Sequence, residues 1–467
     1  MAEEWNQAAF SRAGGELIMV TEIANEKSAY SSALRDLMKG SGEPVWLREL
    51  RGRSFDQFER VGFPGVDQEE WKYTNVAPIK RTNFTPVVNS NGTALSKRNG
   101  LAPFIYDETR DSTFVFVNGI FREDLSSSQG LSGVVALDLN DALQISEYER
   151  VIRASLERNS NDDNNGFELL NTALFAGGLF VSIPRGVDLR TPIQLQFVSE
   201  PVKAGVPAAV FPRVLIVGEE NSSATIIESY RATGEGVYLT NAIVDLVLSE
   251  GSRFQHYKVQ RESAGASHIA TTRADLGPKA SYDTTTINFG AALSRHDIHV
   301  TMDHEGASCS VDGLYMVEGS QHTDTHSVID HRRPHCTSRQ LYKGILDGKS
   351  RAVFNGKVFV RHGAQQTDAQ QTNKNLLLSS EAQIDTKPQL EIYADDVKCT
   401  HGAAVGQLEP DELFYLESRG INPALAKNML TYGFAGEVIE KIQIESIRRE
   451  LDEAVLNRLH VELAIES

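Results

Sequence analysis

The feature that most constrains the fold of this chain is a long stretch, from about Leu179 to Ala394, of short segments in which apolar and polar residues alternate. Alternation with a period of two predicts β-strands. Turn residues that include glycine separate the segments, as at Gly277-Pro278 and Asp347-Gly348. A run of so many short strands predicts a sandwich, a barrel or a solenoid.

The spacing of the turns favours the solenoid. Glycine-bearing turns recur at uneven intervals of roughly a dozen to two dozen residues, which is compatible with coils of varying length. Polar rows such as Thr284-Thr285-Thr286 and Thr323-Asp324-Thr325 suit stacked coils, in which like side chains lie above one another. We therefore predict a mainly β fold with a parallel β-helix, in preference to a sandwich.

Helical patterns flank this stretch on both sides. Near the start of the chain, Trp46, Leu47 and Leu50 form one short apolar face, and Ser54 is placed to cap a further helix. Near the end, Pro410 begins one helix and Asn422-Pro423 begins the next. We predict an N-terminal helical and mixed domain over residues 1–165, a β-helix core over 166–406 and a C-terminal helical domain over 407–467.

The end of the chain carries an apolar stripe on a charged helix, with apolar residues at intervals of four. Such a stripe packs either on its own domain or on a partner, and we expect the first. The stripe consists of Ile447, Leu451, Val455, Leu459 and Leu463.

Composition and charge narrow the class of protein. The chain is 40% hydrophobic and 23% charged, which is ordinary for a soluble protein. Its net charge of −17 argues against a general nucleic-acid binder, because phosphate contact needs a basic surface. No run approaches the ~18 apolar residues of a membrane helix, and Met1–Trp5 does not resemble a signal peptide. We expect a cytoplasmic protein, or a plastid stromal one whose presequence has been removed.

The candidate binding motif is Cys399-Thr400-His401. The three cysteines, Cys309, Cys336 and Cys399, are odd in number and widely spaced, which argues against a disulfide framework and fits a reducing compartment. In an extended backbone, Cys399 and His401 lie on one face with Cα atoms roughly 6–7 Å apart. Thiol and imidazole groups bind soft or borderline metals well. The spacing alone leaves open that Cys399 is an inert, buried cysteine.

A glycine-rich segment, Gly344–Ser350, resembles a phosphate-binding loop at first sight. It has three residues between its glycines, whereas that loop needs four. A strand-like segment, Arg351–Val360, follows it instead of the helix whose N-terminus would hold the anion. We interpret the segment as a tight turn between strands.

A group of histidines with one cysteine is a second weak pattern. On a strand, a spacing of four residues separates Cα atoms by ~13 Å, which is too far for shared metal ligation. Stacking of these side chains from different coils stays open, but surface and interface roles are favoured. The residues are His322, His326, His331, His335 and Cys336.

Several motifs in the block Phe354–Tyr432 occur together. They are Phe354–Val358 (Phe-Asn-Gly-Lys-Val), Gln366–Asn373 (Gln-Thr-Asp-Ala-Gln-Gln-Thr-Asn), Asn375–Ser379 (Asn-Leu-Leu-Leu-Ser), Pro388–Ile392 (Pro-Gln-Leu-Glu-Ile), Asp395–Gly402 (Asp-Asp-Val-Lys-Cys-Thr-His-Gly) and Phe414–Ile421 (Phe-Tyr-Leu-Glu-Ser-Arg-Gly-Ile). Together they resemble the SufB/SufD family of iron–sulfur cluster assembly proteins, and Trp71–Thr74 fits the N-terminal domain of that family. The SufB branch commonly reads Cys-x-His-Glu, so Gly402 resembles the SufD branch.

The resemblance implies a right-handed parallel β-helix flanked by helical domains. It implies pairing with SufB through the β-helices, near their C-terminal ends, and docking of the ATPase SufC on the C-terminal helices, here roughly Leu408–Ile442. It places His401 at the SufB interface, where a transient iron–sulfur cluster forms, with Cys399 as a second candidate contact. It further allows a flavin at the level of the complex, although no flavin motif is present, and a homodimer in isolation.

Two other functions stay open on the sequence. A purely structural adaptor would position SufB and SufC without contributing a ligand. A β-helix enzyme acting on polysaccharides is allowed by the fold alone, but no signal peptide, catalytic triad or paired metal-binding motif supports it. We therefore expect a non-enzymatic assembly subunit, with ATP hydrolysis in SufC.

Overall fold

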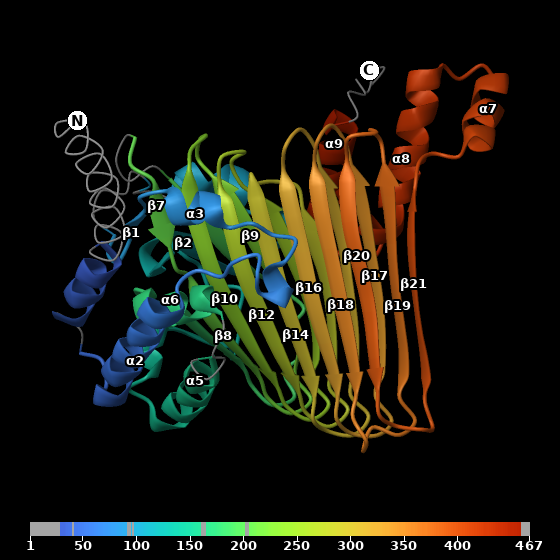
Figure 1. Cartoon of the computed structure of the whole chain (residues 1–467). Coiled ribbons are helices and arrows are strands. Elements are labelled where there is room, and N and C mark those ends of the chain that lie inside the picture. Colours follow the sequence, from blue (N-terminus) through green and yellow to red (C-terminus); the bar gives the residue numbers. More distant parts are fainter. Residues whose placement is uncertain are drawn as a thin grey trace, which may run out of the picture.

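The computed structural model of the chain describes residues 29–39, 42–90, 95, 98–159, 165–200 and 205–458. Its core is a parallel β-solenoid, in which successive strands enter two sheets in turn and, from Tyr238 onward, each strand pairs with the strand two positions earlier (Figure 1). The mainly β fold with flanking helices confirms the predicted fold class.

Sheet A has eleven strands. They are β1 (Thr85–Pro86), β4 (Val135–Asp138), β5 (Leu179–Ile183), β7 (Ala208–Val210), β8 (Arg213–Gly218), β10 (Tyr238–Leu248), β12 (Ser267–Leu276), β14 (Leu293–Met302), β16 (His322–His331), β18 (Arg351–Val360) and β20 (Gln383–Ile392). From β5 to β20 every main neighbour is parallel, and only β4 joins antiparallel.

Sheet B has ten strands. They are β2 (Thr113–Val117), β3 (Ile120–Arg122), β6 (Ile193–Ser199), β9 (Ser223–Ala232), β11 (Arg253–Arg261), β13 (Ser281–Asn288), β15 (Ser308–Val317), β17 (Thr337–Leu346), β19 (Asp368–Leu377) and β21 (Lys398–Gly406). β2 and β3 close one end of the sheet as an antiparallel hairpin, and β21 is the strand at the other end.

The interior of the solenoid is filled by side chains from both sheets, and glycines make room for tyrosines of the neighbouring coil. A Cβ atom added at Gly313 would lie 2.2 Å from the ring of Tyr342, and one added at Gly344 would lie 2.1 Å from the ring of Tyr315. Both tyrosines are fully buried. These glycines are therefore required by packing density rather than by backbone conformation.

A cluster of charged side chains lies inside the same interior, near the middle of the chain. Lys258 contacts His268 at 2.9 Å, and His268 contacts Glu262 at 2.7 Å. Glu228 contacts His256 at 2.7 Å. Burial lowers the pKa of Lys258 to about 8, against the opposing effect of the carboxylates of Glu228 and Glu262. Such buried groups are costly unless they are paired, so the coils are held in the register that pairs them.

Helices cover the outer faces of the sheets. On sheet A lie α2 (Val45–Val61), α5 (Ser146–Asn159) and α6 (Gly166–Leu174), and on sheet B lie α8 (Pro423–Ile439) and α9 (Glu445–Arg458) (Figure 1). The remaining helices are a helix over residues 29–39, α3 (Ala77–Arg81), α4 (Leu139–Ala142), α7 (Pro410–Ser418) and the 3-10 turns η1 (Glu69–Trp71), η2 (Arg98–Phe104), η3 (Asp107–Thr109) and η4 (Glu123–Leu125). In the described part of the chain, no helix is long and apolar enough to cross a membrane.

Three helix predictions can be compared with the structure. The prediction that Ser54 caps a separate helix is wrong, because α2 runs without a break and Ser54 is buried within it. Asn422 caps α8 as predicted, and its side chain accepts a hydrogen bond from the Leu425 N–H at 2.9 Å. The apolar stripe is buried against sheet B at Ile447, Leu451 and Val455, whereas Leu459 and Leu463 lie outside the described residues.

The predicted domain boundaries at residues 165 and 406 stay predictions. Strands β1 to β4 come from the first 165 residues and nevertheless join the two sheets. At the other end, β21 finishes at Gly406 and α7 begins at Pro410.

Candidate functional site at the open end of the solenoid

Cys399 and His401 both lie on β21, the last strand of sheet B (Figure 1). In the register of the sheet, Cys399 is beside Ala369 and His401 is beside Gln371, and both of these β19 residues are buried. Register partners in a parallel sheet point to the same face. The two candidate residues therefore face the solenoid axis at its open end, as the predicted alternation requires.

Each candidate residue continues a row of side chains that begins in the preceding coils. Gln371 donates a hydrogen bond to Oε1 of Gln340 at 2.6 Å, and Gln340 donates to Oγ of Ser327 at 2.8 Å, so His401 extends a polar row. Cys399 packs against the apolar core and is half-buried, whereas His401 is exposed. The imidazole is the accessible group, and the thiol is the sheltered one.

The protonation of Cys399 bears on its use as a ligand. Burial raises the pKa of the Cys399 thiol above its ordinary value, and the charge of Asp368 adds to the increase. A metal ligand must be the thiolate. In the isolated chain Cys399 is thus a neutral thiol at neutral pH, and it becomes a ligand only when a metal or another positive charge displaces the proton.

The backbone of β21 presents a free edge. The N–H of Lys398 donates to the carbonyl of Thr367, the residue just before β19, at 2.8 Å. Because N–H groups alternate between the two sides of a strand, the even-numbered residues of β21 bond to β19 and the odd-numbered ones point away. The free N–H groups therefore belong to Cys399, His401, Ala403 and Val405.

β20, the end strand of sheet A, lacks one N–H group in the row along its free edge. The N–H groups of Gln383 and Tyr393 both donate towards β18, at 3.0 and 2.8 Å. The even-numbered positions of β20 hence face the free edge, and one of these is Pro388, which has no N–H. Proline on an edge strand interrupts pairing with a further strand. β21 is therefore the more complete template for strand addition.

The chain alone does not form a metal site in the residues that the structure describes. Within them, no three His, Cys, Asp or Glu side chains lie close enough to hold a metal ion. Cys399 and His401 supply two ligand types that suit iron, and they lie at an edge that another chain can complete. These residues fit one half of a shared site.

The two weaker sequence patterns are explained by the strands. Gly348 lies in the turn between β17 and β18 with a φ of 63°, so the interpretation of Gly344–Ser350 as a turn is confirmed. His322 and His326 lie on the outer face of β16, next to Thr74 and Glu70, whereas His331 contacts Ser338 inside the solenoid. The described structure does not bring this histidine group together as a metal site.

Sequence reasoning missed a network that ties the N-terminal region to sheet A. We call the segment Gln68–Thr74 the arm. Thr74 donates to Asp324 at 2.5 Å, and the guanidinium of Arg295 lies 3.8 Å from the ring centroid of Trp71. The sequence shows Trp71–Thr74 only as a motif that resembles the family's N-terminal domain. Its partners on strands more than 200 residues later could not be found from local spacing.

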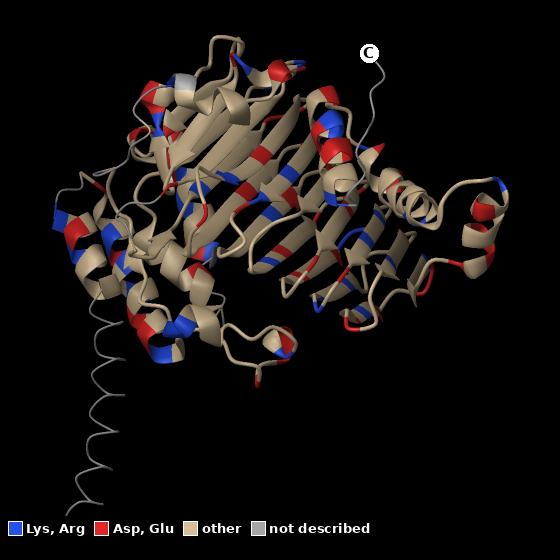
Figure 2. Cartoon of the chain, turned by 90° about the horizontal axis from the view of Figure 1, so that it is seen from above, with Lys and Arg blue, Asp and Glu red and all other residues tan. Residues whose placement is uncertain are grey.

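The C-terminal helices carry the other exposed feature. α7 stands apart from the rest of the molecule (Figures 1 and 2) and contributes no buried side chain. Its Phe414 and Tyr415 are 72% and 57% exposed, and Met429 on α8 is 46% exposed. Exposed aromatic groups gathered on one helical hairpin are typical of a surface that binds a partner.

The fold and site define a class of parallel β-solenoid proteins with a Cys-x-His motif at the open end and a helical appendage. Comparison with known proteins gives the family. Residues 201–434 match the model of the SufBD core domain of the SUF system for iron–sulfur cluster assembly, and residues 28–195 match the SufBD N-terminal region. The chain belongs to the SufBD family of iron–sulfur cluster assembly proteins.

Relatives align over most of the chain. A SufBD family protein of Synechocystis is 35% identical over 93% of this chain and 95% of its own length. The iron–sulfur cluster assembly protein SufD of Escherichia coli is 31% identical over 86% of this chain and 91% of its own length. SufD of Bacillus subtilis is 28% identical over 92% of this chain and 98% of its own length. These SufD relatives agree with the branch that Gly402 indicated.

Proposed function

We propose that this chain is a scaffold subunit of the SUF assembly complex, which pairs with SufB through the open end of its solenoid. The observation that carries the proposal is the free edge of β21, where the unpaired N–H groups and the side chains of Cys399 and His401 occur on the same strand. A partner strand added at this edge satisfies the backbone and places its own side chains beside the motif.

The nascent iron–sulfur cluster is the cargo of this site. His401 offers an exposed imidazole to iron, and Cys399 offers a thiol that a metal converts to a thiolate. SufB supplies the remaining ligands, because this chain presents only half of a site. The pairing thus joins assembly of the complex to assembly of the cluster.

The C-terminal hairpin is the proposed docking surface for the ATPase SufC. Phe414, Tyr415 and Met429 provide its apolar contacts. α8 is anchored to sheet B, where Lys343 donates to the Phe434 carbonyl at 2.9 Å. Just after α8, Lys441 donates to Asp312 at 2.7 Å. SufC hydrolyses ATP, and this chain is a non-enzymatic subunit in the cytoplasm or plastid stroma.

The test is reconstitution with SufB and SufC of the same organism under anaerobic conditions. His401→Ala should leave the complex assembled, as measured by size-exclusion chromatography, and should abolish the cluster absorption spectrum. Thr400→Ala is the matched control, since Thr400 lies between the two candidates and points to the other face. A normal cluster spectrum with His401→Ala would refute the ligand role.

A purely structural adaptor is the second candidate, and the packing of the half-buried Cys399 against the apolar core favours it. This function predicts a normal cluster yield in the double variant Cys399→Ala/His401→Ala. It also predicts loss of the complex when Phe414 and Tyr415 are both replaced by Ser. The two proposed functions therefore predict different cluster yields for the double variant, and both predict loss of the complex when the hairpin is changed.

A further inference from the structure

The arm Gln68–Thr74 crosses the outer face of sheet A as far as its last strand. Thr74 is bonded to β16, and the Glu70 carbonyl accepts a hydrogen bond from Arg295 of β14 at 2.7 Å. The Glu70 carboxylate pairs with Lys357 of β18. Glu69 pairs with Lys387 of β20 at 2.6 Å. The arm thereby links the N-terminal region to the strand at the open end.

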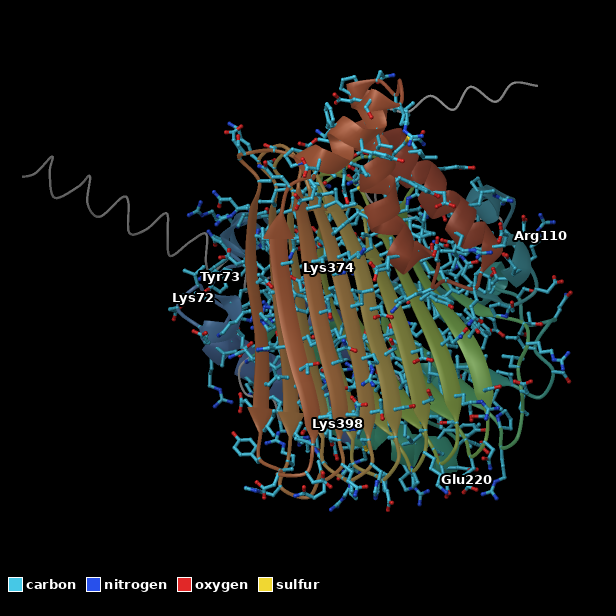
Figure 3. All side chains as sticks on the ribbon, turned by 90° about the vertical axis from the view of Figure 1, so that its right-hand side faces the viewer. Lys72, Tyr73, Arg110, Glu220, Lys374 and Lys398 are labelled. Carbon is cyan, nitrogen blue, oxygen red and sulfur yellow. The ribbon has the colours of Figure 1, made fainter. Side chains whose placement is uncertain are left out.

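The arm combines buried anchors with exposed side chains. Trp71 is 4% exposed and stacks on Phe167 with 5.4 Å between ring centroids. The side chain of Glu69 is 61% exposed. Lys72 and Tyr73 are also exposed, and Figure 3 shows them at the flank of the open end. One part of the arm is fixed in the core, and the other is presented to solvent.

The exposed part is an electrostatic cluster beside β20. The hydrogen bond that Lys387 donates to Glu69 raises the pKa of Lys387, and the negative charges of Glu69 and Glu70 act in the same direction. The hydrogen bond from Lys387 lowers the pKa of Glu69, and Lys72 lowers it further. The Lys72 ammonium also lies 5.5 Å from the ring centroid of Tyr73. With the neighbouring pair included, three lysines (Lys72, Lys357 and Lys387) face two glutamates (Glu69 and Glu70), so the cluster carries an excess positive charge.

A strand that joins the open end at β20 meets this cluster directly. Side chains opposite each other on neighbouring strands have Cβ atoms about 4.5–5.5 Å apart. Lys387 points to the outer face, since its register partner Asn355 and the neighbouring Lys357 belong to the outer surface of β18. The outward side chain of the added strand therefore lies beside Lys387, within reach of Lys72 and Tyr73.

We infer that the arm is a lateral part of the subunit interface, in which Lys72 and Tyr73 of the arm, together with Lys387 of β20, hold an acidic side chain on the outer face of the adjacent strand of a second SufBD chain. The inference rests on the proposed pairing at the open end. We call the contacts of Lys72, Tyr73 and Lys387 with the partner the clamp. The clamp complements the pairing at β21, because Pro388 weakens backbone pairing at β20 and side-chain contacts hold the partner there instead. The positive cluster selects an acidic partner surface.

The experiment measures the affinity of the full-length chain for SufB of the same organism by isothermal titration calorimetry. Lys72→Glu and Tyr73→Ala should each weaken binding by about 3- to 10-fold, which is the range for a charge or an aromatic group at an interface rim. Lys72→Arg should restore the affinity. Lys80→Glu, an exposed residue on α3 with the same change of charge, should bind within about twofold of the parent.

The outcomes separate the arm from the pairing. If Lys72→Glu and Tyr73→Ala bind as the parent does, while Ala403→Pro on the free edge of β21 loses binding, the clamp is wrong and the pairing holds. If Ala403→Pro also binds normally, the proposed pairing fails. If the parent chain does not bind SufB, both fail. A loss in Lys72→Glu that disappears at about 0.5 M salt supports the electrostatic clamp.

Discussion

Replacing Ala403 with proline should weaken partner binding without loosening the fold, whereas replacing its neighbour Ala404 should loosen the fold. The N–H of Ala403 points to the free edge of β21, and the N–H of Ala404 points to β19. Both side chains are one methyl group on the same exposed strand. The pair thus isolates the direction of a single N–H group.

The magnitude follows from the hydrogen bond and the proline ring. A backbone hydrogen bond contributes about 0.5–1.5 kcal/mol net, and crowding of the ring against the facing strand brings the cost to about 2–3 kcal/mol. In Ala403→Pro this cost appears only in the complex, so the dissociation constant should rise about 30- to 150-fold. In Ala404→Pro the same cost appears in the isolated chain, as detachment of β21.

Hydrogen exchange followed by NMR tests the reasoning residue by residue. In the isolated parent and in Ala403→Pro, the amides of Lys398, Thr400 and Gly402 should be protected, and those of Cys399, His401 and Val405 should exchange fast. The partner should protect the fast group in the parent only. Equal protection of odd and even residues in the isolated chain would refute the assigned edge. Unchanged affinity in Ala403→Pro would refute its use in pairing.

Three further predictions concern stability, each measured by thermal unfolding with a matched variant. Gly313→Ala should lower the free energy of unfolding by about 1–3 kcal/mol, because the added Cβ overlaps the Tyr342 ring. Gly402→Ala, whose added Cβ would meet no atom of a non-adjacent described residue within 4 Å, should change the free energy of unfolding little. Equal losses in the two variants would contradict the tyrosine–glycine packing. Glu450→Gln should lower the free energy of unfolding by about 1–3 kcal/mol, since it leaves Arg231 and Arg261 without their carboxylate at the α9 interface. Glu445→Gln, which removes an exposed ion pair, should change it by no more than about 0.5 kcal/mol. A larger loss in Glu445→Gln than in Glu450→Gln would contradict the anchoring role of Glu450. His326 should stabilise the arm most at low pH. Burial and the charge of Arg295 lower the pKa of His326, but Asp324 and Glu70 outweigh them, so the net pKa is raised. The stabilising contribution is therefore complete below the ordinary pKa of 6.5 and is lost as the pH rises through the raised pKa. The difference in melting temperature between the parent and His326→Gln should accordingly shrink from about pH 6 to pH 9, and growth of that difference with pH would show that the sign is wrong.

The sequence was a good guide to elements whose cause is local. The alternation over Arg351–Val360 corresponds to β18 residue for residue, and Asn422 caps α8 as its position predicts. The extended Cys399-Thr400-His401 followed from the same periodicity. The prediction that Ser54 caps a separate helix is wrong because burial of α2 against α6 outweighs the capping preference of serine.

Features that depend on the stacking of coils could not be predicted. The ring of Tyr342 fills the space over Gly313, which lies in the preceding strand of its sheet, and Thr74 bonds to a strand about 250 residues away. Which N–H groups of β21 face outward depends on which strand precedes it in the sheet, and not on β21 itself. Local patterns specify the strands, but three-dimensional register decides what each strand presents at the open end.

The terminal coil, with its free strand edge, also bears on the local stability of the molecule. In a solenoid each coil is stabilised mainly by its neighbours, so a terminal coil with a neighbour on one side only is the first to open. Cys399 and His401 lie on this last coil. A second chain that continues the solenoid turns the terminal coil into an internal one. With the pairing proposed above, order at these two candidate ligands would be acquired on association, and the chain alone would not present a rigid site for iron.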